Sequence, residues 1–323
     1  MKNSIPFGPV PSRRLGRSLG INNIPPKICS YSCVYCQVGK TYNLSIERKE
    51  FYKAEEIKTQ VFKKIAALKK QKEKIDFLSF VADGEPTLDI NLGKEIEILK
   101  KSGIPIAVIT NASLINRNDV RSDLSKADWV SVKIDAVSEK IWRKINRPHP
   151  DLSLKNILKG ITKFSKEYKG ELYTETMLIK GKNTDRKHIR EIADFIESLK
   201  IKKAYISIPT RPPASKSAEV PDEKTINMAY NLFIQRKINV EILSGYSSIE
   251  FPATKNVREE ILNITSVHPM REEDVKNILD KAGKDWNIIE DLLAKGELKM
   301  VILEKTKFFL RSFKKDIKNG ENK

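Results

Sequence analysis

The chain has 323 residues, 40% of them hydrophobic, which suits one barrel-sized domain with a small appendage. Its 60 Lys and Arg against 42 Asp and Glu give a net charge of +18, which favours a polyanionic partner such as nucleic acid. No apolar run approaches the roughly 18 residues of a membrane span and no secretory signal pattern is present, so we expect a cytoplasmic protein.

Strand and helix patterns alternate along most of the chain. A helix over 54–71 carries an apolar stripe formed by Ile57, Val61, Ile65 and Leu68. Strands are predicted at about 15–21, 77–86, 105–113, 129–136, 172–181, 204–213 and 239–243. Helices are predicted at 93–103, from the end of the strand at 105–113 to about 127, from 137 to 168, at 186–200 and at 222–237. Short connections between alternating elements predict parallel strands and an α/β fold, a partial (β/α)6 barrel of the TIM-like kind.

The loops that follow the strands are the expected place for function, because barrel enzymes collect functional groups at the carboxyl ends of their strands. These loops begin at Cys29, Asp83, Asn111, Asp135, Lys180 and Pro209.

The composition changes near 245–255, which divides the chain into a barrel (1–250) and a second domain (251–313). Three short helices and a hairpin predict a winged helix-turn-helix there, with the wing tip at 304–306. The polar segment 314–323 lacks an apolar period and predicts a disordered basic tail.

All three cysteines of the chain, Cys29, Cys33 and Cys36, lie in one C-x3-C-x2-C segment. An odd, clustered set does not predict a disulfide framework, and reduced thiols of this kind usually hold metal. A structural zinc site requires a fourth ligand, and the three histidines lie far off in sequence. A tetranuclear iron–sulfur cubane fits, since three cysteines hold it and leave one iron open.

This spacing, with the aromatic Tyr35 before the last cysteine, resembles the signature of the radical SAM superfamily. The resemblance implies one [4Fe-4S] cluster whose open iron binds S-adenosylmethionine (SAM) through its amino and carboxylate groups. It also implies reductive cleavage of SAM to a 5′-deoxyadenosyl radical that abstracts hydrogen from a substrate. An electron donor of the flavodoxin or ferredoxin type is implied as a partner, and a partial barrel as the fold.

Further segments resemble the family's SAM-binding motifs. Gly84-Glu85-Pro86 resembles the GGEP-type motif, with Asp83 in place of its first glycine, and implies that Glu85 accepts from the SAM amino group. By the same resemblance, polar or adenine contacts to SAM come from Asn111, Ser113, Ser131, Lys133, Asp135 and the Ile179-Lys180-Gly181 segment. Alternatively, Asn111 and Ser113 cap the next helix, and Lys133 and Asp135 form an ion pair inside the barrel. The resemblance identifies no catalytic residue of this chain.

The block FGPVPSRRLGRSLGINNIPPKICSYSCVYCQVG resembles a group related to wyosine-type tRNA synthesis enzymes. The wyosine enzyme ligates a second iron–sulfur cluster with additional upstream cysteines, and this chain has none to spare. The resemblance therefore supports radical SAM chemistry more strongly than it supports wyosine chemistry.

Three functions remain open. The first is a radical SAM enzyme that modifies RNA, such as tRNA, which the charge favours unless lysine simply covers every exposed helix face. The second is a radical SAM enzyme acting on a protein, peptide or metabolite. The third is an iron–sulfur regulator, although the acidic candidate recognition helix at 285–293 argues against DNA reading. Arg13, Arg14, Arg17 and Arg211 are candidate anion contacts or ordinary surface arginines, and positive charge on the wing and tail comes from Lys299, Lys305, Lys307, Arg311, Lys314 and Lys315.

Overall fold

The computed structural model describes residues 5–81, 83–243, 256–267, 269–303 and 306–312. The strands are β1 Pro6–Ser12, β2 Gly16–Ile21, β3 Ile28–Cys29, β4 Asn43–Leu44, β5 Phe77–Phe80, β6 Ile106–Thr110, β7 Trp129–Lys133, β8 Glu171–Met177, β9 Lys203–Ser207, β10 Val240–Leu243, β11 Met270–Arg271, β12 Leu298–Leu303 and β13 Thr306–Arg311. The helices are α1 Ala54–Lys70, α2 Leu92–Lys100, α3 Asn118–Leu124, α4 Glu139–Asn146, α5 Leu154–Glu167, α6 Arg186–Glu197, α7 Glu223–Ile234, α8 Val257–Val267, α9 Glu272–Lys281 and α10 Asn287–Ala294.

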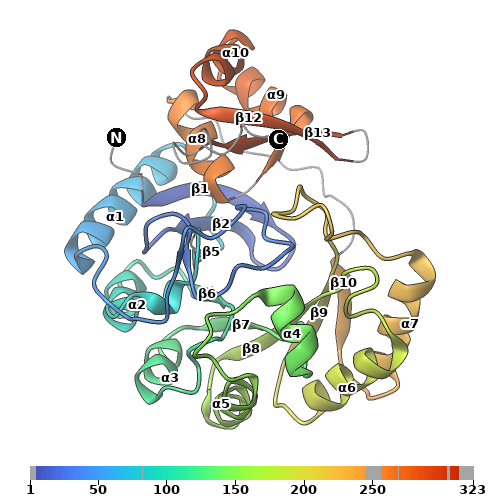
Figure 1. Ribbon diagram of the computed structural model, residues 1–323. Coiled ribbons are helices and arrows are strands. Elements are labelled where there is room, and N and C mark those ends of the chain that lie inside the picture. The colour runs from blue at the N-terminus through green and yellow to red at the C-terminus, as the bar shows by residue number, and fades with distance from the viewer. Residues whose placement is uncertain (1–4, 82, 244–255, 268, 304–305, 313–323) are drawn as a thin grey trace.

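An eight-stranded sheet in the order β1-β2-β5-β6-β7-β8-β9-β10 curls into an open barrel, with the helices of the β/α units around it (Figure 1). All neighbouring strands from β2 to β10 run parallel. The prediction of parallel strands in an α/β fold is therefore confirmed. β1, which was not predicted, pairs antiparallel with β2 and forms one edge of the sheet.

The main core lies between the strands and their helices. The predicted stripe on α1 is confirmed, because Ile57, Val61, Ile65 and Leu68 are all buried. Inside the barrel, Trp129 stacks on Tyr173 with ring centroids 4.7 Å apart, and Tyr173 stacks on Tyr205 at 5.7 Å. Trp129 and Tyr173 lie in the first halves of their strands and Tyr205 at the middle of β9, whereas the polar side chains Lys133, Glu175 and Ser207 follow nearer the carboxyl ends.

Residues 256–312 form a second hydrophobic core around Ile261, Ile278 and Phe309. The three helices and the hairpin predicted there are present, and a short strand, β11, adds a third strand in the order β11-β13-β12. This unit lies against the β1 edge of the barrel (Figure 1), where Val10 packs on its core. The Gly8 N–H donates to Glu260 of α8 at 3.0 Å, so α8 covers an otherwise open sheet edge. Of the predicted wing tip at 304–306, only Thr306 is described, as the first residue of β13, and the predicted tail lies outside the described residues.

No described helix is long and apolar enough to cross a membrane.

A buried pair of carboxyl groups, Asp89 and Glu95, predicts pH-dependent stability. Burial, as the main cause, and the negative charge of nearby Asp89, as the second, raise the pKa of Glu95 to about 9. Burial also raises the pKa of Asp89. The unfolded pKa of Glu95 is lower, so the native state binds the extra proton more tightly. The contribution of protonated Glu95 to the free energy of unfolding should therefore be fully present below about pH 4.5 and be lost as pH rises towards 9. For one proton, the slope is at most about 1.4 kcal/mol per pH unit.

Glu95→Gln mimics the protonated carboxyl and should flatten this slope in urea unfolding measured between pH 6 and 9. Glu97→Gln, an exposed position on the same helix paired with Lys126, is the matched control. Equal slopes in wild type and Glu95→Gln would contradict the prediction.

Candidate functional site

The three cysteines lie on the long loop between β2 and α1, and all three are partly buried. The loop turns tightly, because the Cys36 N–H donates to the Cys33 carbonyl at 3.1 Å and the Gly39 N–H to the Cys36 carbonyl at 3.2 Å. Val34 points inward instead and packs with Ile145 and Ile179. Val34 therefore anchors the segment between Cys33 and Cys36 to the barrel.

The chain at the end of α4 holds this loop through backbone hydrogen bonds. The bonds join Val34 N to Ile145 O (2.9 Å), Ser32 N to Asn146 O (3.0 Å) and His149 N to Ser30 O (2.9 Å). Arg147 ends α4 in the left-handed conformation, with φ at 44°, which turns the chain back towards the cysteines. The loop is thus fixed by a segment more than a hundred residues away in the sequence.

The Gly84-Glu85-Pro86 segment lies directly against the cysteine loop. The Lys27 N–H donates to the Asp83 carbonyl at 2.7 Å, and the Glu85 N–H donates to the Ile28 carbonyl at 3.2 Å. A Cβ atom at Gly84 would overlap that same Ile28 carbonyl. Glycine is required here because two backbones pass within contact distance.

Glu85 is buried and its carboxylate is held from three sides. It accepts from the Thr87 N–H at 3.1 Å, from the Thr110 hydroxyl at 2.6 Å and from the Asn111 N–H at 2.7 Å. Burial is the main reason that its pKa is raised. The carboxylate therefore ties together the ends of β5 and β6, in addition to any contact with a ligand.

Asn111 and Ser113, at the end of β6, reach the cysteine loop. The Asn111 side chain donates to the Cys29 sulfur at 3.5 Å and to the Ser30 hydroxyl at 2.9 Å. The Ser113 hydroxyl lies 2.6 Å from that of Ser30. The helix-cap alternative is wrong, since Arg117 is the cap residue of α3.

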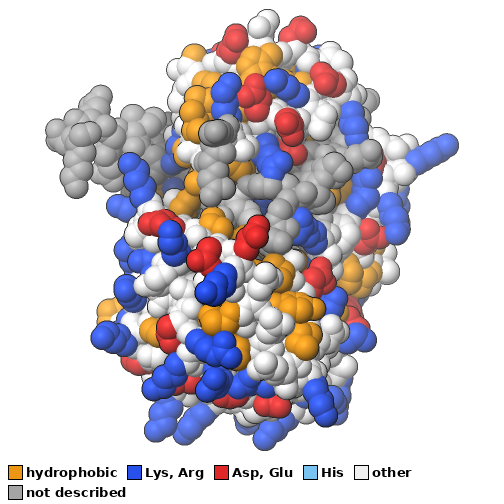
Figure 2. All heavy atoms as spheres, turned by 90° about the vertical axis from the view of Figure 1, so that its right-hand side faces the viewer, with side chains coloured by type: hydrophobic (Ala, Val, Ile, Leu, Met, Phe, Trp, Pro, Cys, Tyr) orange, Lys and Arg blue, Asp and Glu red, His pale blue; other side chains and the backbone are white. Residues whose placement is uncertain are grey.

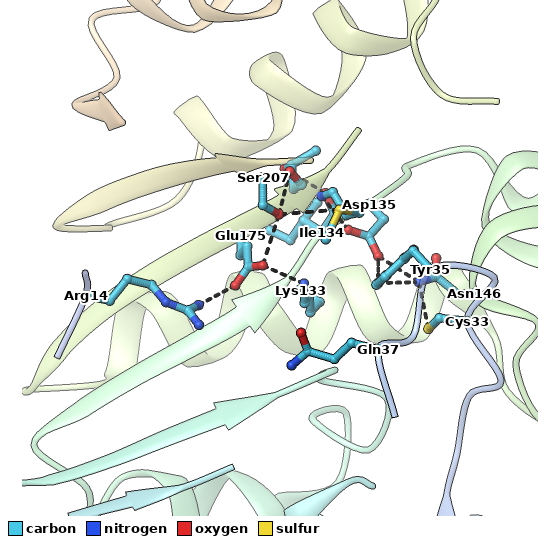
Figure 3. Close-up of polar contacts among 12 residues, drawn as sticks. Arg14, Cys33, Tyr35, Gln37, Lys133, Ile134, Asp135, Asn146, Glu175 and Ser207 are labelled. Atoms are coloured by element: carbon cyan, nitrogen blue, oxygen red, sulfur yellow. Dashed lines mark hydrogen bonds and ion pairs between the residues drawn. The ribbon is translucent and has the colours of Figure 1, made fainter. Parts of the chain in front are cut away.

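Inside the barrel, Lys133 faces the neighbouring strand β8 (Figure 3). Its ammonium donates to Glu175 at 2.7 Å, and Glu175 also pairs with Arg14. The alternative of a Lys133–Asp135 ion pair is therefore wrong: Glu175, which the sequence analysis did not single out, is the partner. Arg14 and Lys133 lower the pKa of Glu175 to about 2, although burial opposes them. Ser131, on the same strand face, is buried and its hydroxyl has no hydrogen-bond partner.

Asp135 leads back to the cysteines. Its carboxylate accepts from the Tyr35 hydroxyl, from the Asn146 side chain at 2.7 Å and from the Met177 N–H at 2.8 Å (Figure 3). The Asn146 side chain also donates to the Cys33 sulfur at 3.5 Å. Tyr35 and Asp135 thus occupy one network that touches a thiol.

Two other predicted positions lie close by. Ile179 is fully buried under the cysteine loop, and its N–H donates to Asn183 at 2.8 Å. Arg211, on the loop after β9, approaches Gln37 next to the last cysteine, at 3.5 Å. Both belong to the same end of the barrel as the thiols.

The electrostatics of the thiols suit a cationic centre. Burial, followed by the neighbouring Asp135 and Cys36, raises the pKa of Cys33 to about 12, and burial also raises the pKa of Cys29 and Cys36. Side-chain amides nevertheless point at two of the sulfurs and favour their charged form. Thiols of this kind lose their protons when they ligate a metal centre, so the donor set fits one.

Comparison with known proteins agrees with this arrangement. The family model of the radical SAM superfamily matches residues 23–196, which include the cysteine loop and the strands from β5 to β8. The chain belongs to the radical SAM superfamily. The cofactors of this superfamily, and so of this chain, are a [4Fe-4S] cluster and SAM.

The UPF0026 protein MJ1312 of Methanocaldococcus jannaschii is 49% identical over 99% of both chains. A radical SAM methyltransferase from Sphaerobacter thermophilus shares the fold, with a TM-score of 0.53, 17% identity and coverage of 70% of this chain and 66% of the other. A structure of TYW1 with a lysine-pyruvate adduct bound gives a TM-score of 0.51, 19% identity and coverage of 68% and 73%. At these identities, the structural neighbours establish the fold alone.

Asp83 is the point where this radical SAM chain departs from the GGEP-type motif. Its carboxylate is buried, and burial raises its pKa to about 7, although the Ser266 hydroxyl opposes the shift. It faces a cavity of about 20 Å³, lined also by Ser266 of α8 and Arg311 of β13. At this cavity the C-terminal unit therefore lies next to Asp83, the residue before Gly84.

Two residues of the site, Asn146 and Glu175, and the neighbouring buried Asn183 were not predicted from the sequence. Glu175 gave a readable signal, since a charged residue in an otherwise buried strand requires a partner. Asn146 ends a helix and Asn183 follows a strand in a polar loop, where asparagine is ordinary. Only the fold brings their amides to the site.

Proposed function

We propose that Cys29, Cys33 and Cys36 hold the [4Fe-4S] cluster and that the chain is a radical SAM enzyme acting on RNA, with tRNA as the substrate. The observation that carries the cluster site is the attachment of the cysteine loop to Gly84-Glu85-Pro86 at the carboxyl end of the barrel. When the [4Fe-4S] cluster is bound and reduced by a donor of the flavodoxin or ferredoxin type, it would supply the electron for reductive cleavage of SAM to a 5′-deoxyadenosyl radical.

The chain's own residues would bind and orient SAM beside the thiols. We propose contacts from Tyr35, Gly84, Glu85, Asn111, Ser113, Ser131, Lys133, Asp135 and Ile179. Lys133 suits an anionic or hydroxyl group of a ligand, because the carboxylates of Glu175 and Asp135 outweigh its burial and raise its pKa. The ammonium therefore stays charged and acts as a hydrogen-bond donor and not as a nucleophile.

RNA is favoured as the substrate by charge and by the group that the N-terminal block resembles. Lys and Arg side chains are spread widely over the face of the molecule in Figure 2, with fewer acidic ones among them. The proposed relationship to wyosine-type enzymes concerns the barrel and the single cluster. The three cysteines of the chain supply ligands for one cluster only.

Bulk tRNA should bind the reconstituted protein and stimulate release of 5′-deoxyadenosine. For six phosphate contacts, binding should weaken by about 10³-fold between 50 and 200 mM salt. Filter binding at several salt concentrations measures the slope, and duplex DNA of equal charge is the control. Salt-insensitive binding, or equal stimulation by DNA and tRNA, would contradict an RNA substrate.

We further propose that the unit at 251–313 is a winged helix, separate from the barrel at 1–250, that contacts RNA or protein through its hairpin. The acidic side chains of α10 do not suit contact with nucleic acid. One of them, Asp291, pairs with Arg258 and Lys295 of the same unit. Positive charge on the hairpin comes instead from Lys299 on β12 and from Lys307 on β13, which lies 3.1 Å from Glu272 of α9.

A peptide or protein substrate is the second candidate, and one observation favours it. β12 is an edge strand on which Met300 and Ile302 are 46% and 61% exposed, a surface that an extended peptide can join as a further strand. Stimulation of SAM cleavage by a peptide, lost in Ile302→Lys and unaffected by tRNA, would replace the RNA proposal.

A further inference from the structure

Two asparagine amides, one after a strand and one at the end of a helix, donate to two of the three thiols. Asn111, after β6, donates to the Cys29 sulfur, and Asn146, at the end of α4, donates to the Cys33 sulfur, each at 3.5 Å. N–H···S contacts of this length are normal hydrogen bonds, because sulfur is larger than oxygen. Such bonds to ligating sulfurs are among the groups that set the reduction potential of iron–sulfur clusters.

The orientation of the Asn146 amide is set by its other partners. Its nitrogen lies 2.7 Å from the Asp135 carboxylate and 3.2 Å from the Tyr35 hydroxyl, as Figure 3 shows. The reverse orientation would place the amide oxygen against that carboxylate and against the sulfur. Asn146 is 2% exposed, so water does not compete for the amide protons.

Asp135 explains why a donor is needed at this position. Its carboxylate is fixed next to the cysteine loop by the Tyr35 hydroxyl and the Met177 N–H. A negative charge at this position opposes the addition of an electron to a nearby cluster. The Asn146 nitrogen bonds to both the carboxylate and the sulfur, and its N–H dipoles offset part of that repulsion.

We propose that Asn146 is a positioning residue that raises the reduction potential of the cluster through its hydrogen bond to the Cys33 sulfur, so that a physiological donor can reduce it. The inference rests on the proposed function, because it assumes that the three cysteines ligate the cluster. It adds to that function a residue that ligates nothing and that no motif identifies.

Asn183 offers a matched control. It is also fully buried and also bound to Asp135, since its side chain donates to the Asp135 carbonyl at 3.0 Å and to the Met177 carbonyl at 2.8 Å. None of its hydrogen bonds is to a thiol. Asn146→Ser and Asn183→Ser therefore remove similar buried amides from the same network, and only the first removes a bond to sulfur.

The test is a redox titration of the anaerobically reconstituted protein, followed by the electron paramagnetic resonance signal of the reduced cluster. Asn146→Ser should bind iron as wild type does, yet its ratio of reduced to oxidised cluster at a fixed potential should fall by about tenfold, or about 59 mV for one electron. Asn183→Ser should match the wild-type potential even if its melting temperature falls. Asn146→Gln should recover part of the lost ratio.

An unchanged potential in Asn146→Ser, or an equal shift in Asn183→Ser, would overturn the inference while leaving the cluster assignment intact. If Asn146→Ser binds no iron, the role of Asn146 is tested instead in protein that keeps this residue and carries ¹⁵N in its asparagine side chains. The measurement is the magnetic coupling between these nitrogens and the reduced cluster. A nitrogen coupling to the reduced cluster that is retained in Asn111→Ser supports the role of Asn146, and its absence overturns it. A wild-type protein that assembles no cluster at all instead refutes the proposed function.

Discussion

Cys33→Ala is expected to abolish both the iron–sulfur cluster and reductive SAM cleavage. With two thiols left, no cubane can be held with one iron open for SAM. Iron should fall from roughly four per chain to near zero, and 5′-deoxyadenosine release should fall by more than about 100-fold, beyond the loss that removing an outer-shell partner causes. Anaerobic reconstitution with iron and sulfide, followed by iron assay and product analysis, measures both.

Ser165→Ala is the matched control, since Ser165 is a small buried residue on α5 that bonds to a helix carbonyl far from the thiols. It should keep the iron and the activity. Retention of SAM cleavage by Cys33→Ala would refute the cysteine assignment. About eight irons in wild type would show a second cluster with ligands other than cysteine.

Gly84→Ala should damage the same site without touching a proposed cluster ligand. The new methyl group would overlap the Ile28 carbonyl, and Ile28 precedes Cys29. The carbonyl is backbone and cannot rotate away, so the cysteine loop must shift. We expect a stability loss of about 1–3 kcal/mol, typical of overpacking, and a loss of SAM affinity of at least about tenfold. Equilibrium binding of SAM to the reconstituted variant measures the second effect.

Gly103→Ala separates this contact from ordinary glycine strain. Gly103 has φ at 74°, and among the described residues no heavy atom beyond its chain neighbours lies within 4 Å of the place that an alanine methyl group would take, so the cost is conformational, about 1–2 kcal/mol. It lies between α2 and β6, away from the thiols, and should leave SAM affinity unchanged. Similar SAM binding by Gly84→Ala and wild type would show that the close approach to Ile28 is not needed.

The sequence was informative about local chemistry and about the order of the elements. The spacing of Cys29, Cys33 and Cys36 pointed to a cluster with an open iron because ligand number is a local property. The spacing of apolar residues in α1 predicted its buried face, because helical periodicity is also a local property. β1 was missed because its segment PFGPVPS carries three prolines and a glycine, which do not favour a strand, and its pairing with β2 depends on a neighbour.

Tertiary structure alone decided which side chains meet. Lys133 pairs with Glu175 and not with Asp135, since adjacent parallel strands place these two residues in register, whereas Asp135 follows the strand end and turns towards Tyr35. Asn146 reaches Cys33 across 113 positions of sequence only because the end of α4 returns to the cysteine loop. A motif specifies the donors that a chain carries, but hydrogen bonds depend on distances and angles that are fixed only when the strands are packed.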